Sequence, residues 1–192
     1  MAISLQKGQR VSLDKRMNLA LIGLGWDENE DNGYDFDLDA SAFLLGRNGK
    51  VACDEDFVFY GNQVHRSGSV KSSGDDTSGG GEGDCEQLII DFDKVPSNVE
   101  TIAITVTIYD ADRRRQNFGQ VSNAYVRVCK IRDERDEGEE IIRYDLDEDF
   151  STETGVVICE IYRYGGEWRF NAVGAGYRGG LEALCRKFGV NV

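Results

Sequence analysis

Long apolar runs are missing from this sequence of 192 residues. The N-terminal segment, MAISLQKGQRVSLDKRMNLA, lacks the sustained apolar core that a secretory signal peptide needs. No segment elsewhere approaches the length of a transmembrane helix. We therefore expect a cytoplasmic protein that is not inserted into a membrane.

Histidine and closely spaced cysteine pairs are scarce as well. The single histidine, His65, stands before Arg66 and Ser67 in a polar segment. It forms no metal cluster and no evident catalytic triad, and we expect it to be an exposed loop residue. The cysteines are odd in number, widely spaced and without a CxxC pair, which indicates neither a disulfide framework nor a zinc site. Free buried thiols are expected at Cys53, Cys85, Cys129, Cys159 and Cys185.

Basic residues are outnumbered, because 22 Lys and Arg face 35 Asp and Glu and the formal net charge is −13 at pH 7. Phosphate backbones and anionic membrane surfaces favour clustered Lys and Arg. We therefore expect no direct binding to nucleic acid or to an anionic membrane, and the acidity favours cation binding instead. The length suits one domain with a single large core, and no linker divides residues 1–192.

The acidic residues concentrate first in GWDENEDNGYDFDLDASAF, residues 25–43. Asp35, Asp37 and Asp39 recur at every second position with apolar residues between them, so in an extended chain the carboxylates share one face. Aspartate is disfavoured in strands, and like charges on one face repel unless a cation neutralises them. Carboxylate oxygens are hard donors, which points to Ca²⁺ or Mg²⁺. The alternative is an acidic edge strand exposed to solvent.

A second acidic stretch, GDDTSGGGEGDCE, covers residues 74–86. Its glycines permit positive φ and close backbone approach, so the segment can curl around an ion and present carbonyl oxygens between its carboxylates. A flexible linker has a similar composition, but the apolar run that starts at Leu88 anchors the acidic end to a strand. The spacing is not that of an EF-hand. The candidate ligands here are Asp75, Asp76, Asp84 and Glu86.

The rest of the chain predicts an all-β sandwich with a short C-terminal helix and minor helical turns. Residues 101–109, TIAITVTIY, alternate β-branched and apolar residues and predict a central strand. Asp110 and Asp112 follow it, and because three arginines come next we expect local ion pairs there rather than further ligands. Other strands are expected at residues 3–5, 11–13, 19–24, 57–60, 88–90, 125–131, 140–144, 156–163 and 167–173.

Turn and helix signals complete the expected fold. Gly165 and Gly166 separate two strands and predict a two-residue hairpin turn, since both central residues of a type I′ turn need positive φ. Apolar residues at helical spacing predict a helix over residues 181–188 that ends at Gly189 and closes one end of the sandwich. Trp26 is expected to cover the core, with a recognition role beside the metal as the alternative.

Several motifs resemble the TerD family of tellurium-resistance and stress proteins. They are GLGWD at residues 23–27, DFDLDASAFLL at 35–45 and the glycine-rich stretch at 74–86. The resemblance covers nearly the whole chain through FYGN at 59–62, TIYDA at 107–111, RRQNFGQVSNAYVR at 114–127, RYDL at 143–146 and EIYRYGGEWRFNAVGAGYRGGLEALC at 160–185.

The resemblance implies a cytoplasmic β-sandwich that carries two neighbouring Ca²⁺ ions, a role in tellurite and chemical-stress resistance, and protein partners in a membrane-associated stress complex. Asp76 stands where the family usually has Asn. Cys85 stands where the family usually has Asp. At this position the chain therefore lacks an acid that either binds the ion or supports a neighbouring ligand. The implied ligands are Asp27, Asp35, Asp37, Asp39, Asp75, Asp76, Asp84 and Glu86.

We expect from these observations a calcium-binding stress-response module without catalysis of its own. A metal-dependent hydrolase is one alternative, because acidic clusters can hold a reactive water. The sequence, however, offers no nucleophile elbow, phosphate loop or His-assisted arrangement. The other alternative is a C2-like adaptor that meets lipid or a partner through Ca²⁺. The lipid-binding form needs exposed apolar or basic loop tips, and the tips here are Asn, Gly, Ser and Asp.

Overall fold

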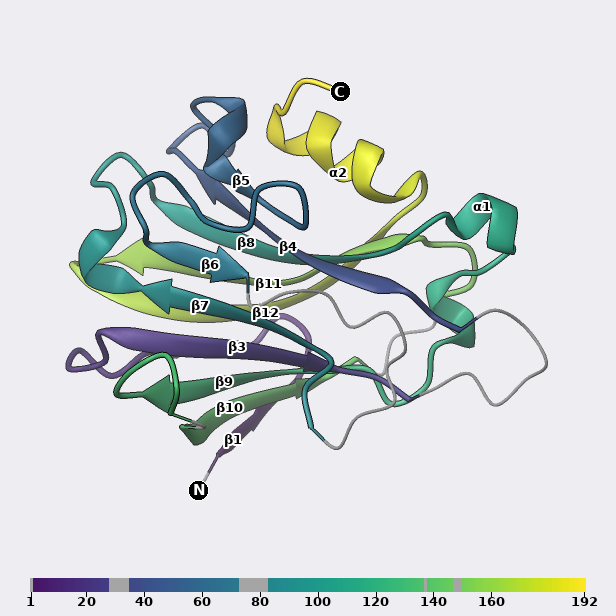
Figure 1. The fold of residues 1–192 in the computed structure, drawn as a ribbon. Helices are drawn as coiled ribbons and strands as arrows, with labels where there is room; N and C mark the ends of the chain where they lie inside the picture. The colour runs from purple at the N-terminus through teal and green to yellow at the C-terminus, as the bar shows by residue number, and fades with distance from the viewer. Residues whose placement is uncertain (1, 28–34, 73–82, 137, 147–149) are drawn as a thin grey trace.

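The computed structural model describes residues 2–27, 35–72, 83–136, 138–146 and 150–192. Within these ranges two six-stranded sheets face each other as a sandwich (Figure 1). The all-β prediction is confirmed. The described helical segments are α1 (Ala111–Arg114), α2 (Gly180–Phe188) and three 3₁₀ turns at Asp54–Asp56, Phe92–Lys94 and Phe118–Gln120. In this part of the chain, no helix is long and apolar enough to cross a membrane.

Sheet A has the strand order β1-β10-β9-β3-β7-β6. The first pair, β1 with β10, is parallel and the other pairs are antiparallel. Its strands are β1 (Ile3–Leu5), β10 (Glu139–Asp145), β9 (Tyr125–Ile131), β3 (Leu19–Gly25), β7 (Glu86–Asp91) and β6 (Val70–Ser72).

Sheet B has the strand order β2-β12-β11-β8-β4-β5. As the alternation in its sequence predicts, β8 lies inside the sheet, between β11 and β4. The two N-terminal strands follow each other in sequence but belong to different sheets. The strands of sheet B are β2 (Arg10–Ser12), β12 (Glu167–Tyr177), β11 (Gly155–Tyr164), β8 (Thr101–Ile108), β4 (Leu38–Leu45) and β5 (Phe57–Val58).

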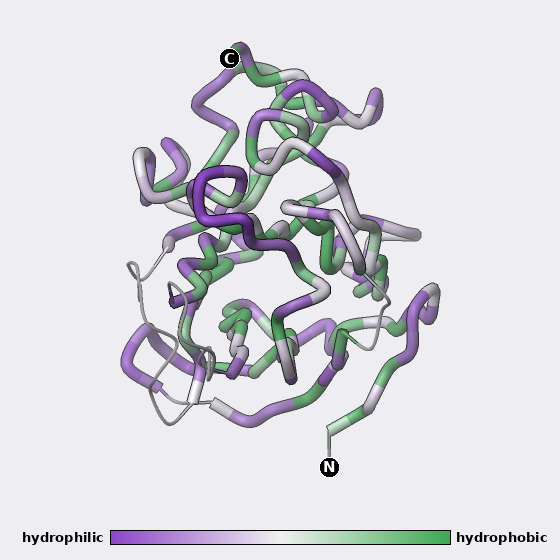
Figure 2. The backbone as a smooth tube through the Cα atoms, turned by 90° about the vertical axis from the view of Figure 1, so that its right-hand side faces the viewer, coloured by the Kyte–Doolittle hydropathy of each residue, from purple (hydrophilic) through white to green (hydrophobic). Residues whose placement is uncertain are grey.

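The core lies between the two sheets, where apolar side chains at alternate strand positions meet. Ile22 and Leu88 of sheet A and Ile104 of sheet B belong to one cluster and are fully buried. Each such side chain contributes ~1.5–3 kcal/mol when it leaves water. Trp26 belongs to this cluster and is 6% exposed, so its predicted place over the core is confirmed. Hydrophobic and hydrophilic residues alternate along much of the described backbone (Figure 2).

The C-terminal helix α2 lies on the outer face of sheet B (Figure 1). Leu184 and Phe188 of the helix pack with Phe43 of β4 and Val157 of β11 in a second apolar cluster. The helix ends as predicted at Gly189, whose φ is 85°. Our expectation that it closes one end of the sandwich is wrong, because the outer face of sheet B carries the apolar surface that the helix must cover.

The predicted hairpin turn joins β11 and β12. Gly165 and Gly166 have φ values of 59° and 79°, and Tyr164 pairs with Glu167 across the turn. Positive φ at both central residues is what a type I′ turn requires. This turn fixes the register of the longest pair of strands in sheet B.

Candidate metal centre

The described parts of the two acidic stretches, residues 25–43 and 74–86, lie at one end of the sandwich, at the right in Figure 1. The end of β3, the start of β4 and the start of β7 all lie there, and β4 and β7 come within 8 Å of each other between Cα atoms. Of the candidate ligands, Asp75 and Asp76 lie outside the described residues. The described candidates are Asp27, Asp35, Asp37, Asp39, Asp84 and Glu86.

Asp37 and Asp39 share one face at the start of β4, as their spacing predicts. Leu38 and Ala40, which alternate with them, belong to the core cluster. β8 pairs with β4 from Leu38 onward, and β5 pairs with it at Ala42 and Phe43. The burial of both aspartates makes the alternative of a solvated edge strand wrong. The two aspartates are only 9% and 7% exposed. The structure therefore places two carboxylates within the protein, on the outer face of sheet B.

These carboxylates line two adjoining cavities. Asp37 and Asp39, together with Tyr60 and Tyr109, line one cavity of ≈ 170 Å³. Asp39 also lines a larger cavity of ≈ 300 Å³, which reaches the first residues of α2. Other oxygen-bearing side chains of this larger cavity are Thr107, Asp110, Asp112, Thr154 and Glu182.

Arginines of α1 supply positive charge to this end of the molecule. Arg113 pairs with Asp110 at 3.0 Å, which confirms the predicted local ion pair for Asp110, while that for Asp112 stays a prediction. Arg114 instead reaches the acidic strand, where its Nη2 donates to Asp37 Oδ2 at 3.2 Å. Its guanidinium also lies 5.4 Å from the centre of the Tyr109 ring. An ion bound at Asp37 would therefore share this carboxylate with a guanidinium.

Asp27 and Asp35 lie at the surface on either side of residues 28–34. Both are exposed, and the carboxylate of Asp27 accepts a hydrogen bond from Asn123 Nδ2. The backbone carbonyl of Asp35 accepts from Gln116 Nε2 at 3.3 Å. Both carboxylates are thus accessible from solvent.

The start of β7 places its two acids differently. Glu86 is 3% exposed and lies opposite Leu24 of β3, on the inner face of sheet A. Asp84 is held by Arg127 of β9, whose Nε and Nη2 donate to its two oxygens at 2.7 and 2.9 Å. Between them, Cys85 packs in the core, and its thiol donates to the Trp26 carbonyl at 3.8 Å.

Among the residues that the structure describes, no three His, Cys, Asp or Glu side chains form a group able to hold a metal ion. The described candidates instead supply carboxylate oxygens from three segments that approach each other. Hard oxygen donors of this kind suit Ca²⁺ in a flexible geometry of high coordination number.

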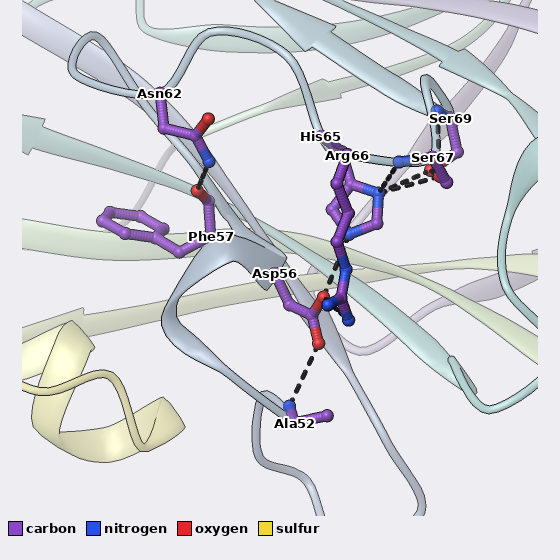
Figure 3. Close-up of polar contacts among 8 residues, drawn as sticks. All are labelled: Ala52, Asp56, Phe57, Asn62, His65, Arg66, Ser67 and Ser69. Carbon is purple, nitrogen blue, oxygen red and sulfur yellow. Dashed lines mark hydrogen bonds and ion pairs between the residues drawn. The ribbon is translucent and has the colours of Figure 1, made fainter.

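The environment of His65 is a feature that sequence reasoning missed (Figure 3). His65 is 1% exposed, so our expectation of an exposed loop residue is wrong. Its Nε2 lies 3.1 Å from Asp56 Oδ1, and its Nδ1 accepts from the Ser67 amide at 3.2 Å. Because an amide can only donate, the ring proton sits on Nε2 and is donated to Asp56. Asp56 is 2% exposed, so the Asp56–His65 pair is shielded from solvent and links two turns of the chain.

A model of the TerD domain family matches residues 1–188. The chain belongs to the TerD family. It is 53% identical over 194 residues to tellurium resistance protein TerD of Serratia marcescens, covering all of this chain and 99% of that protein. It is 48% identical over 196 residues to general stress protein 16U of Bacillus subtilis (strain 168), with both chains covered completely. These names mark a family of tellurium-resistance and stress-response proteins.

The fold agrees with that of a solved TerD relative. The crystal structure of a homologue of the telluride resistance protein TerD from Streptomyces coelicolor A3(2) matches with a TM-score of 0.69. The match covers 86% of this chain and 94% of that one, at 18% sequence identity. At this identity the likeness is one of fold alone, and it agrees with the two-sheet architecture.

Proposed function

We propose that this TerD protein is a non-catalytic, calcium-binding module of a cytoplasmic stress response. Two adjacent Ca²⁺ ions are held at the end of the sandwich where the acidic segments meet. Asp84 is left out of the ligand set, because Arg127 donates to both oxygens of its carboxylate. The proposed ligands are Asp27, Asp35, Asp37, Asp39, Asp75, Asp76 and Glu86.

The observation that carries this proposal is the burial of Asp37 and Asp39 on one face at the start of β4. Successive outward positions of a strand lie ~6.5–7 Å apart, so two carboxylates are presented to neighbouring points of one cavity wall. Burying a carboxylate costs free energy unless its charge is matched. Bound Ca²⁺ supplies that charge.

The chain's own groups prepare the site in two ways. Arg114 compensates part of the charge of Asp37 and holds its carboxylate in place. Tyr60 and Tyr109 wall the cavity beside the two aspartates. The names of the relatives, together with this site, support a role in which a protein partner recognises the calcium-bound protein during tellurite or chemical stress.

The test is a calorimetric Ca²⁺ titration of the wild type, Asp37→Asn and Glu86→Gln. Each variant removes one charged ligand, and we expect at least ~10-fold weaker binding, or ~1.4 kcal/mol. Asp145→Asn is the matched control, since Asp145 forms an exposed pair with Arg143. Mg²⁺ is expected to compete poorly, because it prefers a compact octahedral site. Wild-type affinity and ion count in either ligand variant would remove that stretch from the site.

A further inference from the structure

The surroundings of Asp84 differ from those of the other candidate ligands. Its side chain is fully buried and forms a two-pronged ion pair with Arg127, at 2.7 and 2.9 Å. The Gln87 amide donates to the same carboxylate at 3.2 Å, and the Tyr125 hydroxyl lies 3.2 Å from Oδ1. Two-pronged arginine–carboxylate pairs are among the strongest and most directional hydrogen-bonded pairs in proteins.

The neighbouring strand is shaped to receive this carboxylate. A Cβ added at Gly23 of β3 would lie 2.0 Å from Asp84 Oδ2, and one added at Gly25 would lie 2.4 Å from the Tyr125 ring. Glycine inside a strand marks places where another group approaches the backbone closely. Both glycines therefore open the outer face of sheet A for Asp84 and Tyr125.

Tyr125 links this carboxylate to the preceding residue. Its hydroxyl lies 3.1 Å from the Gly83 carbonyl as well as 3.2 Å from Asp84 Oδ1, and Arg143 stacks 4.0 Å from the centre of its ring. Burial, together with the negative charge of Asp84, raises the pKa of Tyr125 to about 12, so its hydroxyl keeps the proton that it donates. The single Tyr125 proton is shared between the Gly83 carbonyl and Asp84 Oδ1, while Arg127 donates to both oxygens of Asp84.

Asp84 and Glu86 face opposite sides of sheet A. Asp84 lies over Gly23 on the outer face, whereas Glu86 lies opposite Leu24 on the inner face. A single ion would have to draw Asp84 out of its pocket to bind both carboxylates, and this would leave Arg127 without its closest partner.

We propose that Asp84 is a positioning residue and not a calcium ligand. With Arg127 and Tyr125 it fixes the chain where β7 begins, and this directs Glu86 towards the acidic end of the sandwich. The inference rests on the proposed calcium function and deepens it, because it removes one carboxylate from the ligand set and adds a basic residue that the site depends on.

The first test measures the protein in chelator, where calcium plays no part. Asp84→Asn and Arg127→Gln each break the pair, and each is expected to lower the melting temperature by ~6–20 °C. The double variant should be no less stable than the worse single variant, since both changes remove one interaction. Tyr125→Phe is a milder variant that keeps the stacked ring, and Glu167→Gln controls for loss of a surface ion pair, the one with Lys15. Melting temperatures of both single variants within ~1 °C of wild type would refute the positioning role.

The second test is a Ca²⁺ titration of the same variants, in which the two roles predict opposite effects of Arg127→Gln. If Asp84 only positions the chain, both single variants keep the wild-type ion count and weaken binding by similar factors. If Asp84 is a ligand, Asp84→Asn loses affinity or one ion, while Arg127→Gln binds more tightly because no guanidinium competes; that result overturns the inference. Absence of Ca²⁺ binding by the wild type would reject the proposed function, and the melting experiment would still decide the role of the pair.

Discussion

Replacing Asp56 with alanine should be among the most destabilising single changes outside the apolar core. Asp56 is buried and accepts from His65 Nε2 at 3.1 Å, Arg66 Nη2 at 3.0 Å and the Ala52 amide at 3.1 Å (Figure 3). Asp56→Ala leaves the His65 N–H inside the protein without its acceptor, which costs ~1–3 kcal/mol. The whole change resembles the loss of one partner of a buried ion pair, which costs ~3–5 kcal/mol.

Arg66 adds little to this figure, because its side chain is 58% exposed and exposed pairs contribute ~0–1 kcal/mol. We therefore expect Asp56→Ala to lower stability by ~3–4 kcal/mol and the melting temperature by ~6–16 °C. Asp56→Asn keeps an acceptor oxygen and should lose less. Thermal and urea unfolding measure both, with Asp145→Ala as an exposed acidic control. A melting temperature of Asp56→Ala within ~1 °C of wild type would show that the network does not stabilise the fold.

The stability difference between wild type and the Asp56 variants should depend on pH. Burial raises the pKa of Asp56, but hydrogen bonds from His65 and the Ala52 amide and the charge of Arg66 outweigh it, so its pKa lies below the usual value. A lowered folded-state pKa stabilises the protein above the unfolded pKa of ~3.9 and ceases to do so as the pH falls through the folded pKa. The stability gap between wild type and Asp56→Asn should therefore shrink in acid below ~pH 4. A constant gap from pH 7 to pH 2 would contradict this account.

Three further predictions concern the metal, the thiols and the surface. Ca²⁺ at ~100 times its Kd should add ~2.7 kcal/mol per site, so equal melting curves in excess Ca²⁺ and in chelator at neutral pH would contradict a two-ion site. Burial raises the pKa of Cys185 to about 11 and that of Cys159 well above its usual range, so native protein at pH 7 should react slowly with a thiol reagent at both, and rapid labelling of either would be inconsistent with the structure. Anionic vesicles should not co-sediment with the protein at physiological salt, with or without Ca²⁺; calcium-dependent co-sedimentation would favour the C2-like alternative.

Features that depend on local periodicity could be predicted from the sequence. The alternation of residues 101–109 identifies β8 as an interior strand, and Gly165 with Gly166 identifies the turn between β11 and β12. Asp37 and Asp39 share a face because strand geometry leaves them no other arrangement. In each case the physical cause lies within a few residues of the feature.

Features that depend on distant segments could not be predicted in the same way. His65 stands in a polar stretch, yet it is buried because Asp56, on a turn nine residues earlier, accepts the proton of its ring. The sequence predicts α2 at an end of the sandwich, because the amphipathic pattern of a helix does not identify the surface that it covers. That surface is formed by Phe43 and Val157, which belong to strands far apart in the sequence.

Asp84 combines both kinds of feature. Alternation alone would place Asp84 and Glu86 on one face as paired ligands, and a carboxylate-dense sequence supports that interpretation. The direction of Asp84 is set instead by Arg127, 43 residues later, and by the space that Gly23 leaves on the adjacent strand. Arg127 offers two donors to the Asp84 carboxylate. Any side chain at position 23 would clash with that carboxylate. Gly23 within the apolar strand β3, LALIGLG, is therefore the sequence signal for this pair, because glycine weakens a strand interior unless another group must approach its backbone.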